Sequence, residues 1–440
     1  MGAPSLMAKT AAAVLFSLIS STASALDLRQ AYEAALAHDA QYAAARAAYT
    51  AGLQTPVLAR SSLLPQVGAN AEIARLKTDR LPGVNVDNET YALQLRQPLF
   101  RWGAWKTYEQ SKLYSALNEV QLEQHRQQLI LRVSSAYFEV LSAEDALTVI
   151  RAQKTAITEQ LESAKRNFEI GTATITDTHE AQARYDLVLA QEIQAVADLE
   201  VKRTALQHIV GMPITDTLAR LGDTVAIPRP DPAALAEWTD FSQTSNLTVT
   251  QAELSTEIAN YNIEIARSEH YPTVDLAASI SRNKGLVGAS VATDYLDSRS
   301  IGIQVQVPIF AGFATQARVK QAVSQSEQTR SELDVARRQA IQSTHQAYQG
   351  VTAGLAQIRA LEAARRSSQS ALEANRTGYE VGVRINIDVL NAQQQLYTTE
   401  KELSKARYDT LLAGLNLKAA AGILSDDDVL RLNALLYPGS

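Results

Sequence analysis

The chain has 440 residues, of which 46% are hydrophobic and 20% are charged, a composition too apolar for an intrinsically disordered protein. The net charge of -6 at pH 7 argues against nucleic acid as a partner. The absence of cysteine excludes a disulfide framework, a thiolate metal site and a cysteine-linked lipid anchor.

The first residues have the order of a secretory signal peptide. Lys9 precedes an apolar run over residues 11–19, and small residues follow at positions 23–25. We therefore expect residues 1–25 to be removed on export to the periplasm or outer membrane of a Gram-negative cell. The alternative is a buried N-terminal helix. No later stretch approaches the ~20 apolar residues of a spanning helix, so membrane insertion would require a β-barrel.

The remaining sequence contains one long internal repeat. FEIG at residues 168–171 aligns with YEVG at residues 379–382, and Asp177 aligns with Asp388 at the same offset of 211 residues. QPLF at residues 97–100 matches VPIF at residues 307–310. A repeat of this length predicts two related halves of the fold. We assign them to residues 26–211 and 239–423, with an irregular or strand-containing segment at 212–238 and its counterpart at 424–440.

Each half has an alanine-rich helical stretch near its start, residues 28–62 and about 235–269, and continues with two alternating segments. In YALQLRQ, for example, Tyr91, Leu93 and Leu95 fall on one face and polar residues on the other. This period of two predicts β-hairpins over about residues 66–97 and 273–307, with long polar loops at 77–90 and 283–300. We interpret Gly285 and Gly288 as part of an external turn.

Long helices follow each hairpin. Residues 102–167 contain no proline and a single glycine, so they predict one helix of roughly 100 Å that turns near Gly171 and returns over about residues 177–210. The second half repeats this plan around Gly382, with Gly350 and Gly354 as additional flexible points. These helices alone are equally compatible with a coiled-coil strut and with the wall of a tube.

The strands have the amphipathic pattern of an outer-membrane barrel, with apolar side chains toward lipid and polar ones toward a lumen. Four strands from one chain cannot close such a barrel. Two chains would supply eight strands and three would supply twelve, so the hypothesis requires oligomers. Because the hairpins and the long helices occur in one chain, we favour the tube.

The paired motifs are similar to those of the TolC family of outer-membrane channel proteins. The resemblance rests on QPLF and VPIF, on NFEIG with the following TD, on GYEVGVRINIDVLNAQ, and on the repeat itself. It implies an α+β membrane protein: a homotrimer with a 12-stranded outer-membrane β-barrel, four strands per chain, continued by a long α-helical barrel across the periplasm. It also implies a passive exit duct for type I protein secretion, multidrug efflux or both. The implied partners are an inner-membrane ABC or RND-type transporter, a periplasmic adaptor protein and outer-membrane lipid.

The resemblance further implies a gate at the periplasmic helix tips. In the family pattern, Thr176 and Asp177 of the first tip pair with Tyr379 and Arg384 of the second, next to the tip turns at Gly171 and Gly382. Asp388 and Asn391 stand where the family has two acidic rings at a pore constriction, so only one acidic ring is supported. Three Asp388 carboxylates around a narrow pore would attract cations. Helix capping by Thr176, Asp177, Asn386 or Asp388 is the alternative, and the two roles are compatible.

Nothing in the sequence predicts an enzyme. The six histidines show no metal-binding spacing, and there is no G-x-S-x-G, P-loop or dinucleotide fingerprint. We therefore expect no metal and no cofactor. Two alternatives to the duct remain open, a periplasmic adaptor with a helical hairpin and a structural coiled coil of the cell envelope.

Overall fold

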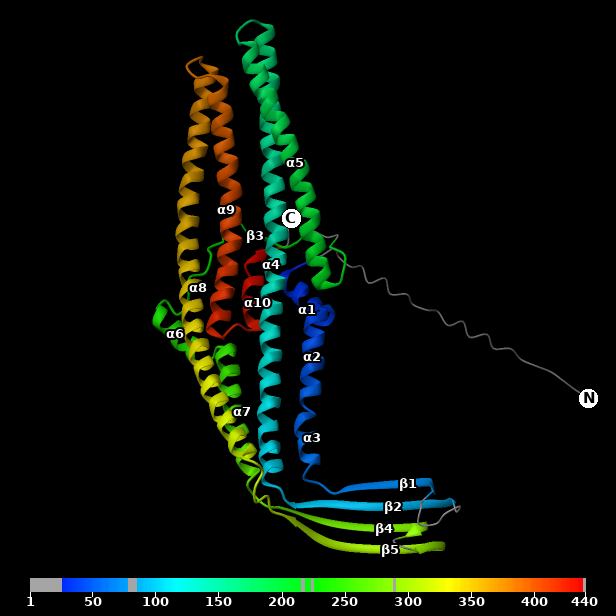
Figure 1. Ribbon diagram of the computed structural model, residues 1–440. Helices are drawn as coiled ribbons and strands as arrows, with labels where there is room; N and C mark the ends of the chain where they lie inside the picture. The colour runs from blue at the N-terminus through cyan, green and yellow to red at the C-terminus, as the bar shows by residue number, and fades with distance from the viewer. Residues whose placement is uncertain (1–25, 78–84, 215–217, 223–224, 288–289, 438–440) are drawn as a thin grey trace, which may run out of the picture.

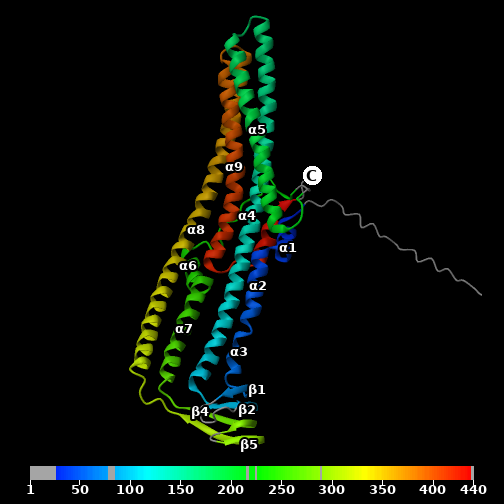
Figure 2. The same ribbon diagram turned by 45° about the vertical axis from the view of Figure 1, so that its right-hand side comes forward.

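The computed structural model describes residues 26–77, 85–214, 218–222, 225–287 and 290–437. The predicted signal peptide and Gly288 lie outside the described residues. Two long helical hairpins lie along a common axis, and a four-stranded sheet lies at one end, its strands running sideways from that axis (Figures 1 and 2). Within the described residues, no helix combines the length and the apolar character needed to cross a membrane.

The predicted helical stretches at the start of each half are interrupted. The first is divided into α1 (Leu28–His38), α2 (Ala40–Gly52) and α3 (Thr55–Ser61), and the second into α6 (Leu235–Thr244) and α7 (Leu247–Ser268). Both predicted helical stretches are therefore present, but neither is one continuous helix. The reason is local, since the Asp39 carboxylate accepts a hydrogen bond from the Tyr42 amide at 2.7 Å and Asn246 caps α7 in the same way.

The two hairpins form one antiparallel sheet in the order β1-β2-β4-β5. Its strands are β1 (Gln66–Lys77), β2 (Asn85–Phe100), β4 (Thr273–Val287) and β5 (Ser290–Gln306). The strands extend well into the predicted polar loops, because ion pairs join opposite residues there, such as Arg75 with Asp87 at 2.7 Å.

Gly285 is part of a strand and not of an external turn. It follows a break in the β4–β5 register and has φ +104. A Cβ at this position would lie 2.6 Å from the Asp87 carbonyl oxygen on β2. The glycine therefore permits a bulge and the close approach of two strands, which explains why the turn prediction was wrong.

The long helices match the predicted plan. α4 has 68 residues and α8 has 67, so each is roughly 100 Å long. The elements are α4 (Trp102–Glu169), α5 (Ile175–Val210), α8 (Ala314–Glu380) and α9 (Asn386–Ala421). Helix α8 continues through Gly350 and Gly354 without a break, contrary to our interpretation of them as flexible points. A Cβ at Gly354 would collide with the Thr410 hydroxyl, so this glycine allows α9 to pack closely.

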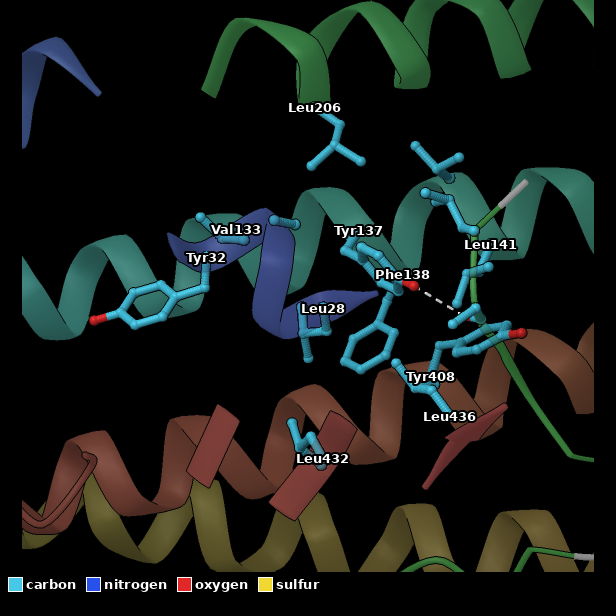
Figure 3. Packing of buried hydrophobic residues seen from close by; sticks show 14 of the residues in the cluster. Leu28, Tyr32, Val133, Tyr137, Phe138, Leu141, Leu206, Tyr408, Leu432 and Leu436 are labelled. Atoms are coloured by element: carbon cyan, nitrogen blue, oxygen red, sulfur yellow. Dashed lines mark hydrogen bonds between the residues drawn. The ribbon is translucent and has the colours of Figure 1, made fainter. Parts of the chain in front are cut away.

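The largest apolar cluster among the described residues joins segments from both ends of the chain, and Figure 3 shows how its side chains pack. Leu28 from α1, Phe138 from α4 and Tyr408 from α9 are buried together, and the Phe138 and Tyr408 rings stack at 5.7 Å. Two short elements close this core: β3 (Arg220–Leu221) pairs antiparallel with β6 (Leu436–Tyr437). The helix α10 (Asp426–Asn433) precedes β6.

Polar contacts hold the connecting segments onto this core. The Tyr137 hydroxyl lies 2.9 Å from the carbonyl oxygens of both Leu26 and Ala219, so it can donate to one of them at a time. Burial raises the pKa of the Tyr137 phenol, which keeps this donor protonated at physiological pH. The buried Glu144 carboxylate pairs with Arg203 at 2.9 Å and with Arg220 at 3.2 Å. These contacts hold residues that are far apart in the sequence against the same part of α4.

Candidate functional site: the helix tips

The two helix tips have nearly the same backbone geometry. Gly171 has φ +78 and Gly382 has φ +80, the left-handed conformation that favours glycine. The Thr172 amide donates to the Asn167 carbonyl at 2.8 Å, and the Val383 amide donates to the Gly378 carbonyl at 2.9 Å. The sequence repeat thus produces the same reversal twice, at the end of the molecule farthest from the sheet (Figure 1).

In the first tip, Asp177 acts as a helix cap. Its carboxylate accepts hydrogen bonds from the Thr174 amide at 2.9 Å and from the Thr174 hydroxyl at 2.8 Å. Thr174, and not Thr176, is the N-cap residue of α5. Thr176 is exposed. The capping role that we considered for Asp177 is therefore present.

In the second tip, Tyr379 and Arg384 have partners other than Thr176 and Asp177. The Tyr379 hydroxyl accepts a hydrogen bond from the Asn167 amide at 3.2 Å. The Arg384 guanidinium lies 3.7 Å from the Asp388 carboxylate, one turn along the same segment. One chain by itself does not bring the four predicted gate residues into one network. Their pairing stays a prediction.

The two predicted constriction residues lie on one face of the second hairpin. Arg384, Asp388 and Asn391 line a hollow of about 490 Å³ between α8 and α9, which Asn375 of α8 also lines. The Asn391 side chain accepts a hydrogen bond from Arg184 of α5 at 3.0 Å. The hollow therefore contains one carboxylate, that of Asp388, and the neutral side-chain amides of Asn375 and Asn391. The Arg384 guanidinium lies in the same hollow.

Asn386 is the residue at the tips that we did not predict as part of the gate. It is 1% exposed at the start of α9, where its side chain accepts a hydrogen bond from Gln160 of α4 and donates one to the Asp177 carbonyl at 3.3 Å. The repeat contains a signal for it, because the first half has Ile175 at the position 211 residues earlier. A polar residue in place of an apolar one marks where the second hairpin contacts the first.

Apolar contact supports the same joint. Leu390, one turn beyond Asn386, is 1% exposed and belongs to a cluster with Leu161 of α4 and Val188 of α5. In contrast, the turns themselves expose aliphatic side chains: Ile170 is 73% exposed, Val381 67% and Val383 76%. The tips therefore combine buried contacts between the two hairpins with exposed aliphatic side chains on the turns.

Long paired hairpins with twin tips at one end, and a sheet of amphipathic strands at the other, define the class of outer-membrane tunnel proteins. A family model described as "Outer membrane efflux protein" matches residues 31–212 and 240–423. The chain belongs to the outer membrane efflux protein family.

Named relatives are similar over nearly the whole chain. The alkaline protease secretion protein AprF of Pseudomonas aeruginosa is 33% identical, over 94% of this chain and 88% of its own. The outer membrane protein TolC of Escherichia coli is 32% identical, over 95% of this chain and 86% of its own. The proteases secretion protein PrtF of Dickeya chrysanthemi is also 32% identical, over 96% of this chain and 93% of its own.

Solved structures show the same fold. That of CusC has a TM-score of 0.79 at 17% identity, over 90% of this chain and 92% of its own. The outer membrane protein VceC from Vibrio cholerae has a TM-score of 0.77 at 18% identity, over 90% of this chain and 96% of its own. The family and the named relatives make the protein a non-enzymatic exit duct of the Gram-negative outer membrane that extends into the periplasm. The adaptor and structural alternatives are therefore not retained.

Proposed function

We propose that three copies of this chain form one continuous tube, closed at the helix tips and opened by partners during export. The main support for a closure at the tips is their position. The two tips contact each other through buried residues at the end of the molecule opposite the sheet. A closure at that end separates the lumen from the periplasm without blocking the exit through the outer membrane.

Oligomerisation is supported by the edges of the sheet. β1 and β5 are the outermost strands, and within the described residues each pairs along one edge only. Unpaired backbone groups are costly in a bilayer, so each edge requires a strand from a neighbouring copy. This pairing closes the sheet into a barrel and turns it toward the tube axis. A heat-modifiable trimer in the outer-membrane fraction is expected, and a soluble monomer would contradict the proposal.

The gate uses weak polar contacts between helix tips. We assign Thr176, Asp177, Tyr379 and Arg384 to contacts that form in the assembled trimer, and Asp388 and Asn391 to the constriction. Contacts of this kind at a partly hydrated site contribute about 1 kcal/mol each, which the docking of another protein can overcome. Their weakness is what makes the tube openable.

The exposed aliphatic residues at the tips are the proposed docking surface for a periplasmic adaptor, which couples the duct to an inner-membrane ABC or RND-type transporter. Ile170, Val381 and Val383 would lose exposed apolar area on docking, a favourable change of roughly 25 cal/mol per Å². The duct itself contains no energy-converting motif, so the transporter must supply the energy.

The cargo is a secreted protein, small toxic compounds or both. The names of AprF and PrtF refer to protease secretion, whereas BepC of Brucella suis is an outer membrane efflux protein. Deletion of the gene distinguishes these cargoes. Loss of specific proteins from the medium indicates secretion, and hypersensitivity to bile salts and dyes indicates efflux. A deletion strain unchanged in both properties would contradict the export role.

A further inference from the structure

The apolar face of the sheet has a defined outer boundary. Register places Val67, Leu95, Ala278 and Ile301 in one row across the four strands, and Ile301 is 78% exposed. The apolar rows extend from Val274 to Ile280 along β4, a span of six residue steps or roughly 20 Å. This is close to the ~25 Å apolar band of membrane barrels. Because apolar and polar side chains alternate along barrel strands, the apolar face is the one directed at lipid.

Apart from Arg299, which lies opposite Ile280, the charged residues of this face begin immediately beyond the band. Arg282 donates two hydrogen bonds to Asp297, at 2.7 and 3.0 Å, in the row next to Ile280. Farther out, the Tyr295 hydroxyl donates to Glu89 at 2.6 Å, and Lys284 lies 3.5 Å from Glu89. The described acidic residues of this rim are therefore occupied by partners from the sheet itself.

Arg299 differs from these paired residues. It lies opposite Ile280 in the last apolar row and is exposed, and it forms no ion pair with any described residue. Its neighbour Asp297 is already engaged by Arg282. An arginine at the edge of an apolar band extends its guanidinium toward the headgroup layer, where phosphate oxygens are strong acceptors.

Two hollows of the sheet meet at Arg299. One, of about 440 Å³, is lined mainly by apolar side chains, including Leu95, Ala278 and Ile301. The other, of about 560 Å³, lies toward the charged rim and is lined by Tyr91, Arg282 and Asp297 among others. Arg299 and Ile280 line both hollows. An apolar hollow beneath a cation matches the chemistry of an acyl chain attached to a phosphate.

We propose that Arg299, assisted by Arg282, binds the phosphate of an anionic lipid of the outer leaflet, with an acyl chain lying against Ala278, Ile280 and Ile301. The inference rests on the proposed barrel, because only there does this face meet lipid. Arg299 contributes the unpaired charge. Arg282 holds the Asp297 carboxylate in an ion pair, so the charge of Arg299 stays available for the phosphate.

Lipid retention by the assembled protein tests the site. Native mass spectrometry after release from nanodiscs of phosphatidylcholine doped with diphosphoryl lipid A counts the lipid A molecules that stay bound. Arg299→Gln should lower retention about tenfold, as expected for the loss of a charge-assisted hydrogen bond. Arg299→Lys should retain most of the binding. Arg338→Gln, which removes an exposed arginine of α8 that pairs with Asp334, should leave it unchanged.

Three outcomes would overturn the site: equal retention by Arg299→Gln, equal binding of lipid A without phosphates, and displacement of lipid A by excess inorganic phosphate. The spectrum also reports the oligomer mass and thereby separates the two levels of the argument. An intact trimer without retained lipid A contradicts only the lipid site. A monomer contradicts the proposed assembly, and the lipid site with it.

Discussion

The Asn386 side chain at the first turn of α9 donates a hydrogen bond to the backbone carbonyl of Asp177 at the first turn of α5. The same amide group accepts from Gln160, so one buried residue joins the second hairpin to both helices of the first. Asn386 is therefore a buried, hydrogen-bonded link between the two hairpins.

Replacement of Asn386 by alanine should favour the open tube. It removes two hydrogen bonds and leaves the Gln160 amide without its partner, at a cost of about 1–3 kcal/mol to the closed state. Single-channel recording in planar bilayers should show a longer open time. Gln369→Ala is the control, because the exposed Gln369 side chain donates a hydrogen bond to Glu373 of its own helix and does not line the hollow at Asp388. Equal open times for both variants would remove Asn386 from the gate.

The double variant Tyr379→Phe with Arg384→Glu should raise single-channel conductance. It removes the tyrosine hydroxyl and reverses the charge next to Asp388, so carboxylates of the second tip repel one another. Arg338→Glu changes an exposed arginine of α8 that pairs with Asp334 of the same helix, and it should leave conductance unchanged. A double variant that stays nearly closed would contradict the assignment of Tyr379 and Arg384.

Asp388→Ala should weaken block of the channel by multivalent cations. In the proposed trimer the Asp388 carboxylates surround the constriction, and their removal leaves the neutral Asn391 on the same face. The converse change, Asn391→Asp, should strengthen the block by adding a second acidic ring. Titration of the conductance with a trivalent cation measures both effects. Block that is insensitive to both changes would place the constriction elsewhere.

The α4–α5 hairpin should lose stability in acid through Glu192. A hydrogen bond from Lys154 at 2.7 Å is the main cause of the lowered pKa of this carboxyl. Because the folded pKa is lower than the ordinary value of 4.5, the stabilisation is complete above that pH and is lost as pH falls through the folded pKa. Thermal unfolding by circular dichroism should show that Glu192→Gln is less stable at neutral pH and that the difference disappears in acid. Glu162→Gln, at an exposed pair with Lys165, should change little at any pH.

Two glycines of α8 should respond oppositely to alanine. At Gly354 the added Cβ would collide with the Thr410 hydroxyl and lie 3.2 Å from the Thr410 Cβ, so overpacking should cost about 1–3 kcal/mol. At Gly350 the nearest atom is the Ala413 Cβ at 4.0 Å, so the gain in helix propensity, up to about 1 kcal/mol, should dominate. Thermal unfolding should show a lower melting temperature for Gly354→Ala and a higher one for Gly350→Ala than for the unchanged protein. Stabilisation by Gly354→Ala would mean that α9 is less closely packed than the structure shows.

Periodicity along the sequence predicted the long helices, the four strands and the twin reversals, since each depends on local patterns. It did not predict the breaks at Asp39 and Asn246, where a single capping side chain outweighs an alanine-rich pattern. It also placed Gly285 in a loop, because the bulge beside Asp87 depends on a strand almost 200 residues away. The gate residues could be selected only through their resemblance to a family pattern.

The sequence by itself determined the order of the elements and the polarity of each strand, because both follow from local spacing and from the repeat. Only the tertiary structure decided which residues meet across the two hairpins. Asn386 is an ordinary helix-start residue until α9 lies against α4 and α5, where burial makes its hydrogen bonds indispensable. Likewise, the sequence does not show that Arg299 lacks an ion pair among the described residues. This follows only from the strand register, which pairs Asp297 with Arg282.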